Sequence, residues 1–350
     1  MRTTAALALV LAGLVGCSAS AAPPPPVAGP KPAARAEGTV YTGAPEGSGA
    51  LASCDALGRW EAGSGVIEHW IYEPETKRRV APGDVGRSLT LFRGSLPFPY
   101  FSWQPSDLQI NQLVYPVGRG FAAMYHVMNH GENAKDCRLF VGLAGDAKKP
   151  DLAASEPMSS SKEGDGGRPA LAFDLNIAPG SSKFVFVTTP DLRGQVPQDA
   201  LDLAAEAWER KLSAHRVGVP DKALMTSYFA DLAGASLGIA GCADGVAKVE
   251  ARLAKRQGDA LRLIPDVPEG WLTDTIEAVG VPTDFGPLTF KHEGAFNTPA
   301  WDLGDACKPP GGFLIPIPGS LKVTVDGKPA EAKDGILKVP AGAKRIETVR

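Results

Sequence analysis

Acidic side chains gather in the C-terminal part of the sequence, where two of them could face each other across a sugar. Hydrolysis of a glycosidic bond needs two carboxyl groups ~5–10 Å apart, one as proton donor and one as nucleophile or base. The candidates are Glu269 beside Trp271, Asp284, Glu293, and Asp302 with Asp305 in WDLGDAC. Acidic residues in turns more often form local caps or face solvent. The spacing therefore does not select a catalytic pair, and Glu269, Asp302 and Asp305 stand as candidates for one.

Two histidines and a cysteine have the residue types of a zinc site. His126 and His130 are four residues apart, and Cys137 follows a short turn. The alternation around them predicts a strand, on which His126, Met128 and His130 share a face. A zinc site needs its ligands to converge, and hairpin packing with a disulfide at Cys137 is the simpler interpretation. We therefore expect no metal and no cofactor.

The remaining cysteines favour two disulfides. Apart from Cys17 these are Cys54, Cys137, Cys242 and Cys307, and an even number in an exported chain allows three connectivities. We expect bridges Cys54–Cys137 and Cys242–Cys307, because each then stays near one half of the chain. Buried free thiols are the alternative.

Aromatic residues form the candidate ligand surface. The stretch LPFPYFSW (96–103) holds four aromatic side chains, and strand alternation places Tyr100 on one face and Trp103 on the other. One face must belong to the core, and the other could stack on the apolar face of a sugar ring. Trp271 and Trp301 allow the same two interpretations. The predicted ligand-binding residues are Tyr100, Trp103, Trp271 and Trp301.

The first residues have the pattern of an exported lipoprotein. Arg2 precedes the apolar run AALALVLAGL (5–14), which is shorter than the roughly 20 residues that span a bilayer. The following LVGC resembles the bacterial lipobox. We expect a signal peptide over 1–16, lipidation of Cys17 and a membrane anchor made of acyl chains. Cleavage of an ordinary signal peptide near Ala22 is the alternative.

The next segment and the overall charge narrow the location and the partners. Residues 17–38 contain four consecutive prolines and no hydrophobic period, which is typical of an extended tether. Ser18, in place of an aspartate, resembles lipoproteins destined for the outer membrane, with either membrane face possible. The net charge is −3 without a basic block, so nucleic acid is not an expected partner.

The body of the chain is expected to be mainly β. There are 40 glycines and 31 prolines in 350 residues, which favours loop-rich β structure. Alternation runs through 39–196, where Pro179-Gly180 should turn one strand back on another. It resumes over 258–350, with a hairpin turn at Asp326-Gly327.

Helical periodicity separates these two β parts. It covers 197–214, 219–237 with Asp221 as N-cap, and 245–257. The sequence thus predicts a β-sandwich domain (39–196), a short helical connector (197–257) and a small C-terminal β-domain (258–350).

Several motifs appear in an order that resembles bacterial six-hairpin glycosidases. IAPGSSKFVFV, AAEAWERKL and VPDKALMTSYFADL resemble the end of that family's β-supersandwich and the entry to its barrel of α-hairpins. LRLIPDVPEGWL and VPTDFGPLTF resemble the stretch after the barrel, which leads into a small β-sandwich domain. The resemblance implies a β-supersandwich-like N-terminal domain.

The catalytic barrel itself has no counterpart. Only 37 residues separate Asp221 from Asp259, whereas twelve helices at ~11 residues each need well over a hundred. The family's acid and base come from that barrel, so no catalytic residue carries over. We expect a non-catalytic, membrane-anchored scaffold that binds a glycan or serves as an interaction subunit. The alternatives are a small glycoside hydrolase with carboxylates between the β-domains, and an accessory subunit of an envelope complex.

Overall fold

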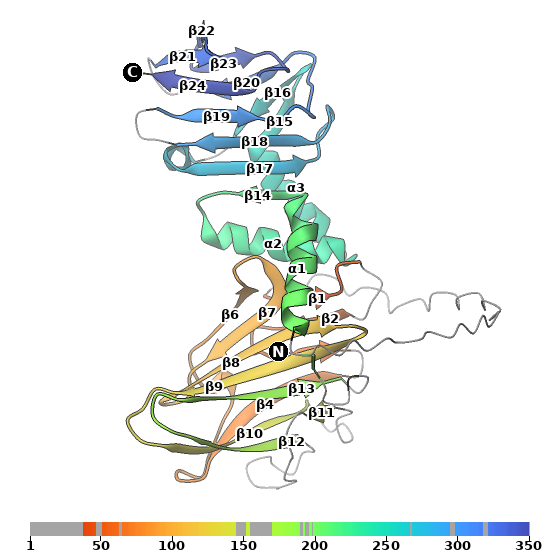
Figure 1. Ribbon diagram of the computed structural model, residues 1–350, viewed down its shortest axis with the longest axis vertical. Helices are drawn as coiled ribbons and strands as arrows, with labels where there is room; N and C mark the ends of the chain where they lie inside the picture. The colour runs from red at the N-terminus through yellow and green to blue at the C-terminus, as the bar shows by residue number, and fades with distance from the viewer. Residues whose placement is uncertain are drawn as a thin grey trace, which may run out of the picture. The chain divides into compact units, whose positions relative to one another are not determined.

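The computed structural model describes residues 38–46, 51–62, 65–144, 152–154, 170–189, 192, 196–197, 199–266, 268–294, 298–317 and 321–349. All of them lie in one of the two units into which the chain divides, Pro32–Arg350. The predicted signal peptide, Cys17 and the tether up to residue 37 fall outside the described residues. The described part of the chain is mainly β, as predicted, with strands in four sheets (Figure 1).

Two antiparallel sheets form the N-terminal β-sandwich. The first has the order β1 (Val40–Gly43), β2 (Leu51–Cys54), β3 (Trp60–Ala62), β4 (Val66–Glu73), β10 (Lys135–Leu143), β12 (Ala170–Ile177), with β5 (Arg78–Val80) also paired to β4. The second has the order β11 (Ala153–Ala154), β13 (Ser182–Thr188), β9 (Gly120–Asn129), β8 (Leu108–Val117), β7 (Leu96–Trp103), β6 (Arg87–Phe92). A short 3-10 helix, η1 (Pro82–Asp84), precedes β6.

Strand alternation places alternate side chains of β7 on two different cores. Phe101 and Trp103 are buried between the two sheets. Phe98 points to the opposite face, where it belongs to the same apolar cluster as Trp208 and Tyr228 of the helices. The helices therefore cover part of the outer face of the second sheet, and Trp208 anchors the first of them by donating from Nε1 to the Gly43 carbonyl at 2.9 Å.

Three helices form the connector, α1 (Ala200–Ser213), α2 (Lys222–Ser236) and α3 (Cys242–Leu253). The Asp221 side chain caps α2 by accepting from Leu224 N at 2.9 Å, as the sequence predicts. The third helix ends four residues earlier than its pattern indicated. Its apolar stripe stops at Leu253, and the next four residues become a strand because they pair with the following one.

The C-terminal part holds the other two sheets. One has the order β14 (Arg216–Gly218), β17 (Thr275–Val281), β18 (Leu288–Glu293), β19 (Ala300–Leu303), β24 (Arg345–Val349), β21 (Lys322–Val325), β22 (Lys328–Ala330). The other has the order β15 (Ala254–Gln257), β16 (Ala260–Leu263), β20 (Phe313–Pro316), β23 (Ile336–Val339), and a 3-10 helix, η3 (Glu269–Thr273), precedes β17. Strands β14 and β15 come from the predicted connector. They pair with β17 and β16, so this segment contributes a strand to each C-terminal sheet.

The two predicted turns have different outcomes. Asp326 and Gly327 both have positive φ, 50° and 76°, and join β21 to β22 as the expected two-residue hairpin. The Pro179-Gly180 turn does not form a hairpin, because β12 pairs with β10 and β13 pairs with β9. It carries the chain from one sheet of the sandwich to the other.

The predicted disulfides are wrong: none of the four described cysteines lies at disulfide distance from another. Cys54 in β2 and Cys137 in β10 are separated by β3 and β4. Three strand spacings amount to about 14 Å, whereas a disulfide needs Cα atoms about 4.4–6.8 Å apart. Cys242 packs in a cluster with Tyr41 and Ile239, while the Cys307 sulfur lies 3.4 Å from Thr283 Oγ1.

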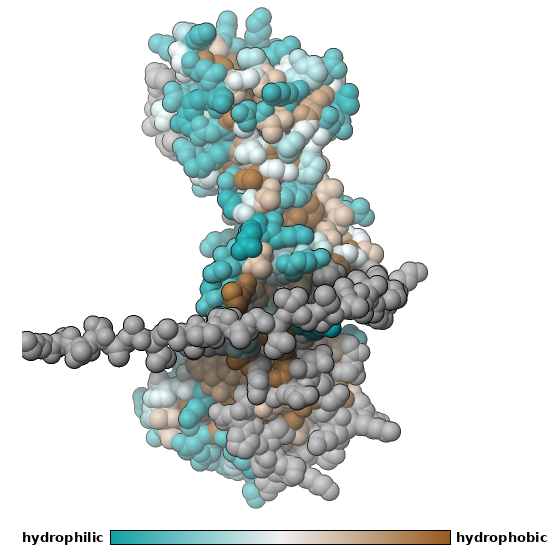
Figure 2. Space-filling model, turned by 45° about the vertical axis from the view of Figure 1, so that its right-hand side comes forward, coloured by the Kyte–Doolittle hydropathy of each residue, from teal (hydrophilic) through white to brown (hydrophobic). Residues whose placement is uncertain are grey.

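Within the described ranges, no helix combines the length and the apolar character needed to cross a membrane. On the face drawn in Figure 2, the C-terminal sheets are mainly hydrophilic, and hydrophobic residues reach the surface at the level of the helices.

Candidate functional site

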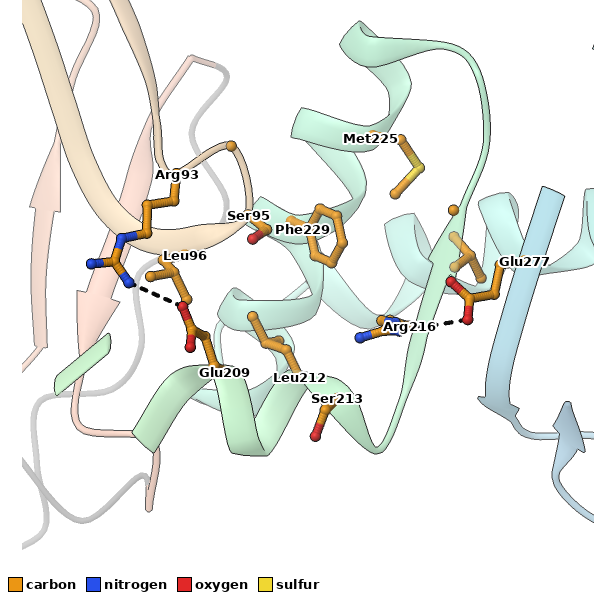
Figure 3. Close-up of a pocket in the computed structure, with 13 residues that line it drawn as sticks. Arg93, Ser95, Leu96, Glu209, Leu212, Ser213, Arg216, Met225, Phe229 and Glu277 are labelled. Carbon is orange, nitrogen blue, oxygen red and sulfur yellow. Dashed lines mark hydrogen bonds and ion pairs between the residues drawn. The ribbon is translucent and has the colours of Figure 1, made fainter. Parts of the chain in front are cut away.

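A cleft of about 640 Å³ opens between the β6–β7 turn, the helical connector and β17 (Figure 3). This volume is typical of small-molecule sites. The lining residues, called the connector cleft from here on, are Arg93, Gly94, Ser95, Leu96, Glu209, Leu212, Ser213, Arg216, Val217, Gly218, Met225, Phe229 and Glu277.

The middle of the connector cleft is apolar. Leu212 is the last buried position of the α1 stripe, and Val217 is the buried residue of β14. Met225 and Phe229 are one turn apart on α2 and are both half-buried. They extend the floor toward solvent, and the Phe229 ring is supported by an edge contact with Tyr228 at 5.6 Å. The cleft therefore offers an aromatic ring and a flexible thioether to a ligand.

Two arginine–glutamate pairs flank this floor on opposite sides (Figure 3). On one side Arg93 contacts Glu209 at 3.2 Å, with Asp202 at 3.5 Å. On the other side Arg216 contacts Glu277 at 3.5 Å. Arg93 and Glu209 are 49% and 52% exposed, and exposed pairs of this kind contribute only about 0–1 kcal/mol. A ligand can therefore replace these partners at little cost.

A mostly buried carboxylate on α3 links two of the segments that line the connector cleft. Glu250 of α3 accepts from the Tyr228 hydroxyl at 3.1 Å and contacts His215 Nε2 at 2.5 Å, through the same oxygen. Its side chain is only 12% exposed. Burial and this carboxylate raise the pKa of the Tyr228 hydroxyl. Because His215 and Tyr228 directly precede Arg216 and Phe229, Glu250 sets the spacing of two cleft walls.

The predicted carboxylates are not brought together. Asp302 is paired with Arg345 at 2.7 Å, and Asp305 is 80% exposed with Lys344 at 3.7 Å. Only the backbone of Glu269 is among the described positions, at the start of η3.

The two other acidic candidates also form surface ion pairs. Glu293 pairs with Lys291 at 2.6 Å, and the hydrogen bond from this lysine lowers the pKa of the glutamate. Asp284 pairs with Arg256 at 3.0 Å. All four of these carboxylates with described side chains thus hold a cationic partner outside the connector cleft.

The predicted aromatic surface is divided among separate places. Trp103 is buried in the sandwich, with its ring 5.5 Å from that of His69, and Trp301 is buried against Phe290 and His292. Neither indole presents a face to solvent, so neither can stack on a sugar in this structure. The half-buried aromatics are Tyr100, whose pKa burial raises, and Trp271 on η3.

The two candidate histidines, His126 in β9 and His130 just after it, are structural in their contacts. His126 stacks on Phe184 with ring centroids 4.1 Å apart, and His130 Nε2 lies 2.9 Å from Gln109 Oε1. Cys137 is in the other sheet of the sandwich. Among the described side chains, no three potential metal ligands from His, Cys, Asp and Glu come together.

Sequence reasoning missed every residue of the connector cleft. Arg93 and Glu209 are 116 positions apart, and no local pattern relates them. The only local hint of the cleft is the stretch WERKL (208–212), which places Glu209 next to the apolar stripe of α1.

No protein-family model matches the chain, and a search of curated proteins finds no match. The fold and the site therefore define the class of protein: it is mainly β, with a helical connector and an amphipathic cleft beside that connector.

Proposed function

We propose that this protein is a lipid-anchored, non-catalytic envelope protein that binds a glycan in the connector cleft. The observation that carries the proposal is the combination of the half-buried Phe229 ring with two arginine–glutamate pairs in one cleft. A sugar has an apolar C–H face and a rim of hydroxyl groups. Phe229 suits the former, and guanidinium and carboxylate groups, with their fixed hydrogen-bond geometry, suit the latter.

The non-catalytic part of the proposal rests on how the two cleft glutamates are used. Hydrolysis needs one carboxyl group as proton donor and a second as nucleophile or base. Glu209 and Glu277 are each engaged with an arginine instead. The resemblance to six-hairpin glycosidases, whose barrel has no counterpart in this chain, supports the same interpretation. The lipobox supports a lipid anchor, and Ser18 supports the outer membrane as its location.

A hydrolase is the second candidate, because Glu209 and Glu277 approach the cleft from different elements, on opposite sides of its apolar floor (Figure 3). If a bound sugar displaced Arg93 and Arg216, the two carboxylates would face it from both sides. This candidate requires turnover that is lost in Glu209→Gln and Glu277→Gln.

The test uses the chain from residue 39 onward with a panel of envelope and plant oligosaccharides, following binding and reducing-end release together. The proposal expects binding without release, weakened about tenfold or more by Phe229→Ala or Arg216→Ala. The matched control is Arg59→Ala, which breaks a sandwich ion pair with Asp55 and should leave binding unchanged. Release that disappears in the glutamine variants would establish the hydrolase, and silence in both readouts would favour the accessory-subunit role.

A further inference from the structure

A second, smaller pocket lies on the β15–β16 hairpin and is rich in cations. Its volume is about 240 Å³. The lining residues, called the hairpin pocket below, are Lys255, Arg256, Gln257, Arg262, Pro265 and Asp266. Asp266 is the one acid among these six, and its side chain is exposed.

Two of these cations oppose each other within the hairpin. Lys255 and Arg262 are direct partners in the antiparallel register of β15 and β16. Side chains at such positions emerge on the same face of the ribbon about 5 Å apart, and like charges there destabilise the pair. Neither forms an ion pair with any described residue. The hairpin thus sets two positive charges at directly opposed positions, and neither has an ion-pair partner among the described residues.

The third cation is engaged on the other face. The Arg256 guanidinium donates to the Gly258 carbonyl at 2.9 Å and to Asp284 at 3.0 Å, and it lies over the Phe285 ring. Side chains alternate along β15, so Lys255 and Gln257 point away from this contact. The polar groups left for a ligand are the Lys255 ammonium, the Gln257 amide and the Arg262 guanidinium.

A buried donor in the hairpin pocket has no acceptor. Arg262 Nε is removed from solvent and donates no hydrogen bond to the described part of the protein. Leaving a charged donor unsatisfied costs more than leaving a neutral one. Because Nε is closed off from solvent, an oxyanion in the pocket meets the terminal nitrogens of the Arg262 guanidinium, and its charge offsets the Lys255–Arg262 repulsion.

We propose that the hairpin pocket is an anion site that binds a phosphate group between Lys255 and Arg262. The group can belong to a lipid headgroup or to a soluble phosphorylated compound, since both present the same oxygens. The proposal is independent of the connector cleft and of any glycan bound there.

The first test titrates sodium phosphate into the chain from residue 39 onward by calorimetry, against sodium chloride of equal ionic strength. We expect phosphate to bind, Arg262→Gln to weaken it about tenfold or more, and Lys255→Gln to weaken it less. The control Lys338→Gln removes an exposed charge from β23 of the same sheet and should change nothing. No heat from phosphate, or equal affinity in Arg262→Gln, overturns the proposal.

A second readout separates a binding role from a structural one. Without phosphate, Arg262→Gln should not lower the midpoint of thermal unfolding, because it removes a like-charge contact. Adding phosphate should raise the midpoint of the wild-type protein alone. A variant that is destabilised without phosphate and still stabilised by it would contradict the proposal.

Two further arms identify the source of the phosphate group. Vesicles of phosphatidylcholine with phosphatidic acid, compared with pure phosphatidylcholine, test the lipid headgroup by co-sedimentation. Glucose 6-phosphate tests a soluble ligand. Binding in either arm that depends on Arg262 supports the anion site and names its source, whereas binding to neither overturns it.

Discussion

His69 should make the stability of the sandwich depend on pH. It lies on β4 with its ring fully buried between the sheets, 5.3–5.8 Å from the rings of Phe101, Trp103 and Tyr125. Burial lowers its pKa to about 3 from an ordinary value of 6.5, although Asp55 opposes the shift. Below pH 6.5 the unfolded chain therefore binds a proton that the folded protein does not.

This difference in bound protons fixes the sign and the size of the change in the free energy of unfolding with pH. The stabilising contribution of neutral His69 is complete above pH 6.5 and is lost as the pH falls, until the folded ring also protonates near pH 3. At about 1.4 kcal/mol per pH unit, the free energy of unfolding should drop by about 2 kcal/mol between pH 7 and pH 5 from this residue. His126 and His292 also have pKa values lowered by burial and add to the total.

The assay compares urea unfolding of the wild type and His69→Leu at pH 7, 6 and 5. Leucine has a similar volume and cannot titrate, so the variant should lose about 2 kcal/mol less than the wild type over this range. His130→Asn, which replaces an exposed histidine, should follow the wild type. If His69→Leu loses as much stability as the wild type, the assignment of this pH dependence to His69 is refuted.

Three other predictions test the packing directly. Tyr228→Phe removes the hydrogen bond to Glu250 and should lower the free energy of unfolding in urea by about 2 kcal/mol. The control Tyr100→Phe should lower it by less than about 0.5 kcal/mol. Equal losses would contradict the role of Glu250. When denatured, the chain from residue 39 onward should react with DTNB at four thiols. In the folded protein Cys54 and Cys137 should be unreactive, because burial raises the pKa of both thiols, that of Cys137 to about 12. Gly280→Ala forces a Cβ to 2.2 Å from the Ala214 carbonyl oxygen at φ 63°, and should lower the free energy of unfolding in urea by about 2 kcal/mol or more. The control Gly118→Ala lies at φ 56° in open space and should show only the smaller strain of its backbone.

Local patterns in the sequence were sufficient for the class of fold and for many of its elements. Alternation predicted the mainly β architecture, and the 3.6-residue period located α1 and α2. Asp221 as N-cap and Asp326-Gly327 as a hairpin turn needed only neighbouring residues, because caps and tight turns are decided by backbone groups a few positions away. The expected signal peptide, the expected lipidation of Cys17 and the expected tether rest on sequence patterns alone and stay predictions.

The tertiary structure decided everything that depends on which elements meet. Pro179-Gly180 looks like a hairpin turn, but the burial of both flanking strands in different sheets makes it a crossover. The expected Cys54–Cys137 bridge fails because two strands lie between its ends. The connector cleft joins Arg93 to Glu209 across 116 positions, and the hairpin pocket depends on the register that sets Lys255 against Arg262. Such contacts arise from packing of distant segments, and hydrophobic periodicity, which reports only the buried face of each element, carries no information about its partner.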